Sequence, residues 1–487
     1  MRILVHCHGG PEIGAGHVFR AAAVAEEALR RGHEVDLHGT FEGSLVADRV
    51  RSLGVRTVAT PRLDSYNVVH LDTYAPYGDE LARRATGAAL VSNVEDATFG
   101  RRPADLVVDP NLGAEGTARE GGPVLARGSR WALLRRSVAD RAGSAGLRDE
   151  ASRILVVLGG TDPLGVTGEV LDLLADTGRP LQVTAVAQPD TGNDLRRRAQ
   201  DLGLDVDLMP PQPDLTDLML ASDLTVSAAG TAVWELCCLG VPAALVCVAD
   251  NQRAGYDRVI GRGGAVGLGD PGRGLDRESA AATLREVLDD AGLRRSLAAA
   301  GRRLVDGRGA WRVVGAWEQL TATSPVVVVA RPVGLRPATA EDADLLRRWR
   351  DDPATRAASR STATVDAESH RAWLARVLGD RGRHLLVGFD DQGELGTVRW
   401  DRVDDGEWEV SITVAPDRRG EGLAGRLLAT GEGWLADREP ATSTMLAAVR
   451  ADNQPSLRLF RSAGFLPDLP PDGEDVLRLV RQRVPTG

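Results

Sequence analysis

The sequence predicts an α/β protein with two successive doubly wound lobes, each built on a parallel sheet, followed by a smaller α+β domain. Three observations carry this prediction. Apolar runs that fit buried strands alternate with helix-periodic segments near the start of the chain, and this alternation restarts at Arg153. Beyond Arg336 the pattern changes to alternating strands and a glycine-rich turn. The 487 residues, of which 43% are hydrophobic, suffice for more than one core.

The first lobe is expected over residues 1–145. The run Arg2-Ile3-Leu4-Val5 fits a buried strand, a glycine-rich turn follows it, and Val18 to Arg31 fits a helix. Further strands are expected at Val68–Asp72 and Ala88–Val91. Strands that alternate with helices indicate a parallel sheet covered on both faces.

The second lobe is expected over residues 146–322. Ile154 to Leu158 fits its first strand, and Val166 to Asp176 fits a helix. Two such lobes favour a ligand cleft between them, because the loops after their strands would face one another. A short apolar linker is expected at residues 323–334 and a third domain at residues 335–487.

The charge composition excludes several functions. The formal net charge is -10, which disfavours nucleic-acid binding, and no nucleic-acid partner is expected. All 59 basic residues are arginine, so that Schiff-base chemistry and a phosphate-binding lysine are excluded. An anionic ligand must therefore meet arginine, a helix N-terminus or backbone amides.

The cysteines and the first residues of the chain indicate an intracellular enzyme. Cys7, Cys237, Cys238 and Cys247 lie in apolar surroundings without a paired spacing, and are expected to be buried free thiols. The apolar run after Met1 is too short, and too interrupted by histidine, for a signal peptide or membrane span. A cytoplasmic location without a membrane partner follows as an expectation.

The first glycine-rich turn contains a candidate catalytic histidine. Gly14 and Gly16 precede His17, and Arg20 lies one helical turn further on. A neutral imidazole at a helix N-terminus can act as a general base on water, and the helix end attracts anionic groups. The alternative is a histidine that only caps the helix.

The second lobe contains a candidate anion site. Small residues from Ser227 to Thr231 join a strand to a helix and would expose backbone N–H groups, and Glu235 follows one turn into the helix. The alternatives are ordinary capping by Ser227 or Thr231 and a solvated position for Glu235.

Taken in order, these segments resemble a known family. Asp72-Thr73-Tyr74 follows one strand, Glu95-Asp96 follows another, Gly128 to Arg135 precedes the second lobe, and Ala249 to Gln252 follows a later strand. Together with the two sites above, they resemble the UDP-sugar hydrolases of pseudaminic acid biosynthesis and their spore-coat relatives. That family is related to GT-B glycosyltransferases that use UDP-N-acetylglucosamine, so the resemblance implies a GT-B-like pair of Rossmann-type lobes.

The resemblance also implies roles for these residues. His17 would activate water to attack the anomeric carbon and release UDP with inversion, and Asp72 and Tyr74 would orient the histidine or the sugar. A glycosyltransferase would use the same groups with an acceptor hydroxyl in place of water. The implied contacts to the nucleotide sugar are Gly14, Gly16, Arg20, Gly160, Thr161, Ser227, Ala228, Ala229, Gly230, Thr231, Glu235, Asn251 and Gln252.

The first loop departs from the family pattern. It has His6-Cys7-His8 where the family leads us to expect an aspartate and a serine, which leaves the identity of the sugar open. His6 and His8 share one face of a strand. No third ligand is evident, so no metal is predicted and packing or ligand contact is favoured.

The last domain carries two hallmarks of another family. The strand Trp408 to Pro416 leads into Arg418-Arg419-Gly420-Glu421-Gly422-Leu423-Ala424, which resembles the Arg-x-x-Gly-x-Ala acetyl-CoA motif of the GNAT superfamily. Further on, Val449 to Phe465 resembles the second hallmark, a strand followed by a helix that begins at Asn453. The implied contacts to acetyl-CoA, which acts as cosubstrate, are Ile412, Val414, Arg418, Arg419, Gly420, Gly422, Leu423, Ala424, Asn453, Ser456 and Phe460.

Catalysis in this domain is less clear from the sequence. Glu409 or Glu407 on the central strand would deprotonate the incoming amine, although an exposed strand carboxylate fits equally well. Many GNAT members have a tyrosine where this chain has Phe460, and phenylalanine cannot protonate the departing thiolate.

Together these features predict a bifunctional enzyme. One half would hydrolyse a UDP-linked 2,4-diacetamido-trideoxy sugar, and the other would N-acetylate a UDP-amino-sugar, as in pseudaminic-type nonulosonic acid biosynthesis. One alternative is a GT-B glycosyltransferase fused to an acetyltransferase that acts on a secondary metabolite or glycan. Another is a GNAT half that only binds CoA as a regulator. The oligomeric state stays open.

Overall fold

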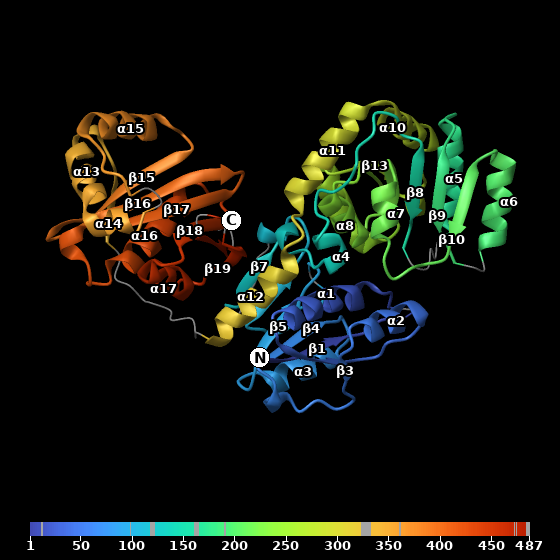
Figure 1. The fold of residues 1–487 in the computed structure, drawn as a ribbon, viewed down its shortest axis with the longest axis horizontal. Coiled ribbons are helices and arrows are strands. Elements are labelled where there is room, and N and C mark those ends of the chain that lie inside the picture. The colour runs from blue at the N-terminus through green and yellow to red at the C-terminus, as the bar shows by residue number, and fades with distance from the viewer. Residues whose placement is uncertain are drawn as a thin grey trace. The chain divides into compact units, whose positions relative to one another are not determined.

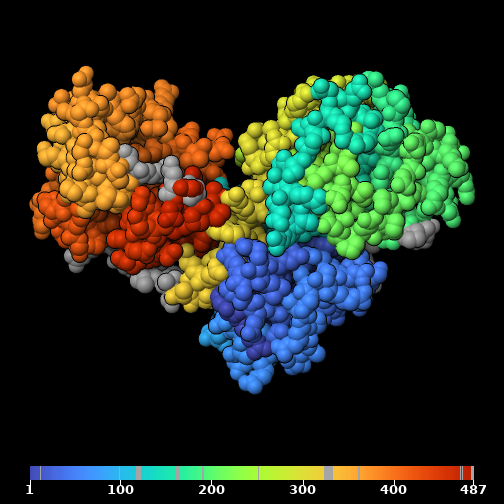
Figure 2. Space-filling view, viewed as in Figure 1, coloured from blue at the N-terminus to red at the C-terminus, as the bar shows by residue number. Residues whose placement is uncertain are grey.

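The computed structural model describes all residues except 11–12, 98, 117–121, 160–164, 189–190, 323–332, 360–361, 472, 474 and 484–487. The chain divides into two compact units. The first comprises Met1–Ala114 and Ala126–Val314, and the second Glu115–Leu125 and Gly315–Gly487 (Figure 1). Figure 2 shows the same chain in a space-filling view. Most of the predicted linker, residues 323–332, lies outside the described residues.

The first sheet of the first unit has seven strands in the order β3-β2-β1-β4-β5-β6-β7. The pairs from β3 through β6 are parallel. The strand order reverses between β1 and β4, so the loops after these two strands flank the switch point where such sheets bind ligands. The strands are β1 (Arg2–Cys7), β2 (Glu34–His38), β3 (Arg56–Thr57), β4 (Val68–Asp72), β5 (Leu90–Val94), β6 (Leu106–Asp109) and β7 (Val124–Arg127). Its helices are α1 (Gly16–Arg30), α2 (Ser44–Ser52), α3 (Tyr77–Ala85) and α4 (Arg136–Ala139), with short 3-10 turns at Leu63–Ser65, Ala114–Gly116 and Ser129–Trp131.

The second sheet has six strands in the order β10-β9-β8-β11-β12-β13, and every pair is parallel. Aliphatic side chains of both faces are buried, as expected of a parallel sheet between two helix layers. The strands are β8 (Arg153–Val157), β9 (Gln182–Val186), β10 (Asp205–Met209), β11 (Leu224–Ala228), β12 (Ala243–Val246) and β13 (Val266–Gly269). The helices are α5 (Val166–Asp176), α6 (Gly192–Leu202), α7 (Thr216–Ala221), α8 (Ala232–Leu239), α9 (Arg253–Gly261), α10 (Arg277–Asp289), α11 (Ala291–Leu304) and α12 (Gly309–Ala322), with 3-10 turns at Asp250–Gln252 and Pro271–Arg273.

The predicted fold class is confirmed, and two predicted boundaries are corrected. Helix α1 begins at Gly16, so His17 lies in its first turn and not in the loop before it. Strand β5 begins at Leu90 because the N–H groups of Ala88 and Ala89 both donate to the carbonyl of Ala85, which prolongs the end of α3 as a turn.

The second unit contains a seven-stranded sheet in the order β14-β15-β16-β17-β18-β20-β19. The described pairs are antiparallel except β17 with β18, which run parallel. The strands are β14 (Gly334–Pro337), β15 (Arg383–Asp390), β16 (Gly393–Asp404), β17 (Glu407–Val414), β18 (Thr444–Arg450), β19 (Leu466–Leu469) and β20 (Val476–Gln482). The helices are α13 (Ala343–Asp351), α14 (Pro353–Ala357), α15 (Ala367–Gly379), α16 (Leu423–Arg438) and α17 (Gln454–Ser462), with 3-10 turns at Ala340–Asp342 and Pro416–Arg418.

The two parallel strands of this sheet separate along their length. Their register pairs Glu407 with Thr444 and Glu409 with Leu446, and it includes no later pair although β17 continues to Val414. The backbone groups of β17 beyond Glu409 are therefore turned toward a gap between the strands. This divergence leaves the sheet open between the two strands.

Gly39 shows how tightly the ends of β1 and β2 pack. Its φ is +146°, and a Cβ placed on it would lie 1.8 Å from the carbonyl oxygen of Cys7. We expect Gly39→Ala to lower the free energy of unfolding by about 3 kcal/mol, because the backbone of β1 would have to move. Gly32→Ala is the matched control: its φ is +80° with no heavy atom within 4 Å, so only the left-handed conformation is penalised, by about 1 kcal/mol. Urea denaturation of both variants tests this, and equal shifts of the midpoint would contradict it.

Candidate active sites

His17 and Asp72 form a buried pair at the switch point of the first sheet. Asp72 ends β4, where it lies opposite Cys7 of β1, and the first turn of α1 places His17 above it. The Nδ1 atom of His17 lies 2.6 Å from Oδ1 of Asp72. The exposed fraction is 6% for His17 and 0% for Asp72, so solvent scarcely competes for this contact.

This pairing favours one tautomer of the imidazole. An ionised carboxylate accepts the Nδ1 proton, which leaves the lone pair of Nε2 available to take a proton from a reacting group. Burial raises the pKa of Asp72, but the charge of Arg20 and the hydrogen bonds from His17 and Arg20 outweigh burial and hold it well below its usual range. Asp72 therefore stays ionised at neutral pH.

Arg20 lies between two carboxylates. Its Nε and Nη2 donate to the two oxygens of Asp72 at 2.9 and 2.8 Å, and its Nη1 donates to Asp96 at 3.0 and 3.1 Å. The hydroxyl of Tyr74 donates to Asp96, and the Tyr74 ring meets the His17 ring edge to face with centroids 4.5 Å apart. The predicted residues His17, Arg20, Asp72 and Tyr74 thus form one cluster, and Asp96, which carried the family resemblance but was given no role, is a further member.

The glycines and small residues of the two lobes lie next to each other. A Cβ placed on Gly16 would lie 4.0 Å from Cγ2 of Thr231, so the beginnings of α1 and α8 are adjacent. Gly14 has a φ of +82° with no heavy atom near the position of a Cβ, which suits a close ligand approach. Two adjacent helix N-termini provide amides and positive potential for a diphosphate.

The residues before α8 have different surroundings. Ser227 and Ala228 end β11, and the buried hydroxyl of Ser227 donates to the carbonyl of Ala228 at 3.0 Å. Thr231 occupies the N-cap position without a side-chain capping bond. The turn residues Ala229 and Gly230 lie between them. The N–H of Ala229 already donates to the carbonyl of Val246 at 3.0 Å, so the backbone groups at residues 230–231 are better placed for an anion than the Ser227 hydroxyl.

Glu235 already has a partner. Its Oε1 accepts from Nε of Arg135 at 2.8 Å, and the guanidinium of Arg135 lies over the Phe19 ring, 4.7 Å from its centroid. Burial raises the pKa of Glu235, and Arg135 opposes this rise. A ribose hydroxyl would have to use the second oxygen of this carboxylate or displace Arg135.

The remaining predicted nucleotide contacts are only partly described. The Nε2 atom of Gln252 lies 3.6 Å from the Cβ position of Gly230, and its Oε1 accepts from the N–H of Val248 at 3.3 Å. Gly160, Thr161 and the side chain of Asn251 lie outside the described residues.

Three further imidazoles gather at the ends of β1 and β2. The His6 ring lies 4.7 Å from the His8 ring and 5.0 Å from the His38 ring, measured between centroids. Burial, together with the two neighbouring imidazoles, lowers the pKa of His6 to about 3, so His6 is neutral. Across the part of the chain that the structure describes, no three histidine, cysteine, aspartate or glutamate side chains are arranged to hold a metal ion.

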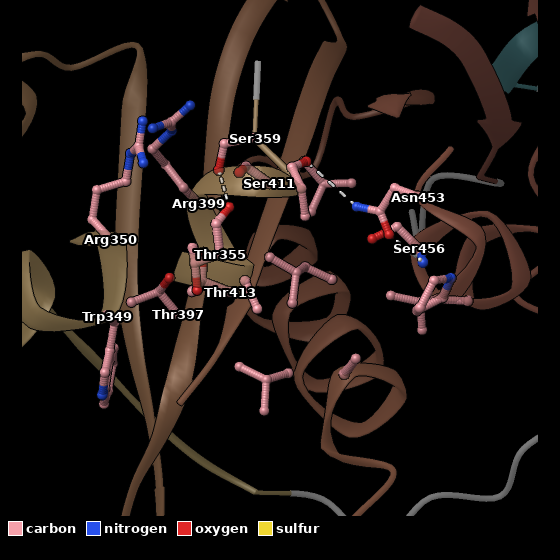
Figure 3. Close-up of a pocket in the computed structure, with 18 of the residues that line it drawn as sticks. Trp349, Arg350, Thr355, Ser359, Thr397, Arg399, Ser411, Thr413, Asn453 and Ser456 are labelled. Carbon is pink, nitrogen blue, oxygen red and sulfur yellow. Dashed lines mark hydrogen bonds between the residues drawn. The ribbon is translucent and has the colours of Figure 1, made fainter. Parts of the chain in front are cut away.

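The second unit contains a cavity of about 990 Å³ at the divergence of β17 and β18. All eleven predicted acetyl-CoA contacts and Glu409 line it. Figure 3 shows Asn453 and Ser456 at one side of it, and Arg350, Arg399 and Trp349 at the other. The residues predicted to contact the cosubstrate therefore line one cavity. The prediction missed the residues that line the rest of this cavity, which include Trp349, Arg350, His370, Trp373 and Arg399.

The glycine-rich turn of this cavity fits a pyrophosphate. Gly420 and Gly422 have φ values of +87° and +71°, and no heavy atom lies within 4 Å of either Cβ position. Gly422 is the N-cap of α16, whose first-turn amides point toward the turn. Asn453 caps α17 by accepting from the N–H of Ser456 at 3.2 Å.

The two arginines of the motif are both ion-paired. Arg418 contacts Asp390 at 3.1 Å and Glu421 at 2.8 Å, whereas Arg419 donates to Asp352 at 2.5 Å. Because carboxylates already pair with both arginines, phosphate recognition would depend on the backbone amides of the glycine-rich turn. On the opposite wall, Phe460 is 5% exposed and packs edge to face with Phe465.

No helix among the described residues combines the length and the apolar character needed to cross a membrane.

Asp109, at the end of β6, carries a perturbed carboxyl group. Burial raises its pKa to about 6, although Asn111 and the N–H of Ala97 donate to it. Because the folded pKa exceeds the unfolded one, the protonated form stabilises the fold, and this stabilisation is lost as the pH rises through 6. From pH 5 to 7.5 the wild type should therefore lose about 1 kcal/mol relative to Asp109→Asn. Urea unfolding of both proteins at the two pH values measures this difference, and a constant difference would contradict it.

Comparison with known proteins agrees with a chain of two different parts, an N-terminal region with two parallel sheets and a C-terminal domain. Residues 333–466 match the family described as acetyltransferase (GNAT) domain. The spore coat polysaccharide biosynthesis protein SpsG of Bacillus subtilis is 24% identical over 66% of this chain and 98% of its own length. A mycothiol acetyltransferase of Clavibacter sepedonicus is 42% identical, but over only 17% of this chain and 26% of that protein. The crystal structure of Acinetobacter baumannii MurG, 17% identical, covers 65% of this chain and 99% of that one with a TM-score of 0.49. Residues 333–466 thus match a GNAT acetyltransferase domain, and the region before them, with its two Rossmann-like parallel-sheet lobes, is similar to SpsG.

Proposed function

We propose that the first unit hydrolyses a UDP-linked 2,4-diacetamido-trideoxy sugar and releases UDP with inversion. The observation that carries this proposal is the buried His17–Asp72 pair beside two adjacent helix N-termini. The pair supplies a general base, and the helix ends supply a site for a diphosphate leaving group. Similarity to SpsG over nearly the whole length of that protein supports the same reading.

Nε2 of His17 takes a proton from water, and the water oxygen bonds to the anomeric carbon while the bond from that carbon to the diphosphate breaks. Asp72 stabilises the imidazolium that results. The amides around Gly16 and Thr231 receive the charge that develops on the leaving UDP. One displacement inverts the anomeric configuration.

The second unit is proposed to N-acetylate the amino group of a UDP-amino-sugar. Its cavity fits acetyl-CoA, which supplies the acetyl thioester, with Gly420, Gly422 and Asn453 as contacts. Glu409 accepts a proton from the amine. Arg350 and Arg399 at the far end suit the acceptor diphosphate, and Trp349 and Trp373 offer surfaces for its base. Acting together, the units would perform consecutive steps of pseudaminic-type nonulosonic acid biosynthesis.

A glycosyltransferase is the second candidate for the first unit. In the described part of this unit the exposed large apolar side chains are Ile13, Tyr74, Tyr77 and Phe99; three lie in loops that follow strands of the first sheet, and Tyr77 begins α3, which follows β4. Exposed aromatic rings beside a catalytic base suit an acceptor molecule. Release of UDP only in the presence of an acceptor would favour this candidate, and release with water alone favours the hydrolase.

For the second unit, a CoA-binding regulator is the other candidate. Phe460 favours it, since this residue lines the cavity and cannot protonate a thiolate. Absence of amine-dependent CoA release across a panel of UDP-amino-sugars would support it.

The first prediction of function concerns His17. His17→Gln should lower kcat/KM for UDP release by a factor of about 100 or more, because the base is removed. Acetyl transfer should stay within about twofold, because this residue belongs to the other unit. His33→Gln is the matched control, since His33 lies at the opposite edge of the first sheet, before β2. Chromatography of UDP gives the rates. Full activity of His17→Gln would refute the proposal.

The second prediction of function concerns Phe460. Phe460→Tyr should raise kcat for acetyl transfer about tenfold, because a phenol on the cavity wall can protonate the thiolate. Phe465→Tyr is the control: this ring packs against Phe460 but does not line the cavity. A disulfide reagent that detects free CoA follows the reaction, and the four protein thiols are buried. An unchanged or lower rate in Phe460→Tyr would show that proton supply does not limit transfer.

A further inference from the structure

Asp96 is joined to the His17–Asp72 pair by two side chains, Arg20 and Tyr74. Of the three guanidinium nitrogens of Arg20, Nε and Nη2 contact Asp72, and Nη1 contacts both oxygens of Asp96. Tyr74 donates its hydroxyl to Asp96 and touches His17 only with its ring. Among the described residues, no hydrogen bond joins Asp96 directly to His17, and Arg20 is the neighbour of Asp96 that reaches Nδ1 of the imidazole.

The guanidinium of Arg20 also competes with Asp72 for Nδ1 of the His17 imidazole. Its Nη2 lies 3.1 Å from Nδ1 of His17, while Oδ1 of Asp72 lies 2.6 Å from the same nitrogen. A donor at Nδ1 favours the tautomer with its proton on Nε2, whereas the carboxylate favours the proton on Nδ1. Only the second tautomer has a lone pair on Nε2. The ratio of the two tautomers depends on how closely the guanidinium of Arg20 approaches Nδ1.

Asp96 holds the Nη1 end of Arg20. It takes the Nη1 end in two contacts, and is itself fixed by the Tyr74 hydroxyl and by Nδ2 of Asn111 at 2.9 Å. Burial raises the pKa of Asp96, but the charge of Arg20 and its hydrogen-bond donors bring it below its usual value, so it stays ionised.

The backbone next to Asp96 is strained. Ala97 has a φ of +57°, which a residue with a Cβ rarely adopts, and its N–H donates to Asp109 at 3.1 Å. The loop after β5 thus adopts an unfavourable conformation that aims Asp96 at Arg20. Such strain persists where the surroundings enforce it, and it is common at functional sites.

We propose that Asp96 is a positioning residue, which sets the tautomer of His17 by anchoring the free end of Arg20. Without this anchor the guanidinium moves onto Nδ1, the proton shifts to Nε2, and the base is lost. This inference rests on the proposed role of His17.

Asp96→Asn tests it, because asparagine keeps the shape of the side chain but loses its charge. We expect kcat for UDP release to fall 10- to 100-fold, with KM changed less than about threefold. Asp79→Asn is the matched control: Asp79 accepts from Nε of the buried Arg102 at 2.9 Å, at the same edge of the sheet but outside this cluster. It should leave kcat unchanged.

A double-mutant cycle tests whether Asp96 acts through Arg20. In an Arg20→Gln background, Asp96→Asn should cost no more than about a further twofold in kcat, since the residue through which it acts is gone. Additive losses in the double variant would overturn the proposal, because they would show a separate route from Asp96 to the reaction.

The tautomer itself gives a readout that needs no substrate. Nitrogen-15 NMR of histidine-labelled protein, with His17→Gln used to assign the signal among 8 histidines, shows which ring nitrogen carries the proton. The wild type should have it on Nδ1, and Asp96→Asn should show a growing fraction on Nε2. An unchanged tautomer overturns the inference. Failure of UDP release in the wild type would instead overturn the proposed function and leave this measurement valid.

Arg20→Lys provides a second variant if Asp96→Asn does not fold. Lysine keeps the positive charge but has a single ammonium group, which cannot span two carboxylates as the guanidinium does. We expect the same shift of the proton toward Nε2. A wild-type tautomer in this variant would also overturn the inference.

Discussion

The buried charge of Asp72 is the constraint on which the first unit depends. A carboxylate with no exposure is stable only with partners, and Arg20 and His17 provide them within 3 Å. This need fixes the approach of α1 to the end of β4. The same pairing orients the imidazole. One electrostatic requirement thus decides both how the helix docks and which nitrogen faces the substrate.

The fold was predictable because it depends on patterns that are local in sequence. Alternating apolar runs predicted both parallel sheets, and α5 has the predicted limits. His17 and Asp72 were found because each lies directly beside a strand or glycine turn. Asp96 was noted after its strand but given no role, since nothing in its neighbourhood indicates that Arg20, far away in sequence, would need a second carboxylate. Likewise, the partner of Glu235 is Arg135, one hundred positions earlier in the chain, and no periodicity connects them.

In the second unit, the motifs predicted the residues at the end of the cavity proposed for the cosubstrate. They did not predict the residues at the end proposed for the acceptor. Glycines and helix starts bind a pyrophosphate through the backbone, so their spacing in sequence is constrained. Trp349, His370 and Arg399 come from α13, α15 and β16, and meet only in the folded chain. Acceptor recognition by separate side chains leaves no short pattern. The divergence of β17 from β18 could not be predicted from the sequence either, because neither strand has a residue pattern that distinguishes it from other strands.

The burial of all four thiols has a practical consequence. Burial raises the pKa of Cys237 and of Cys238 to about 12, which keeps them in the unreactive protonated form. A cysteine introduced on the surface of either unit would then react with a maleimide dye far faster than the native ones. Pairs of such dyes, one on each unit, would report the separation of the two compact bodies in solution and any change of it when nucleotide is added.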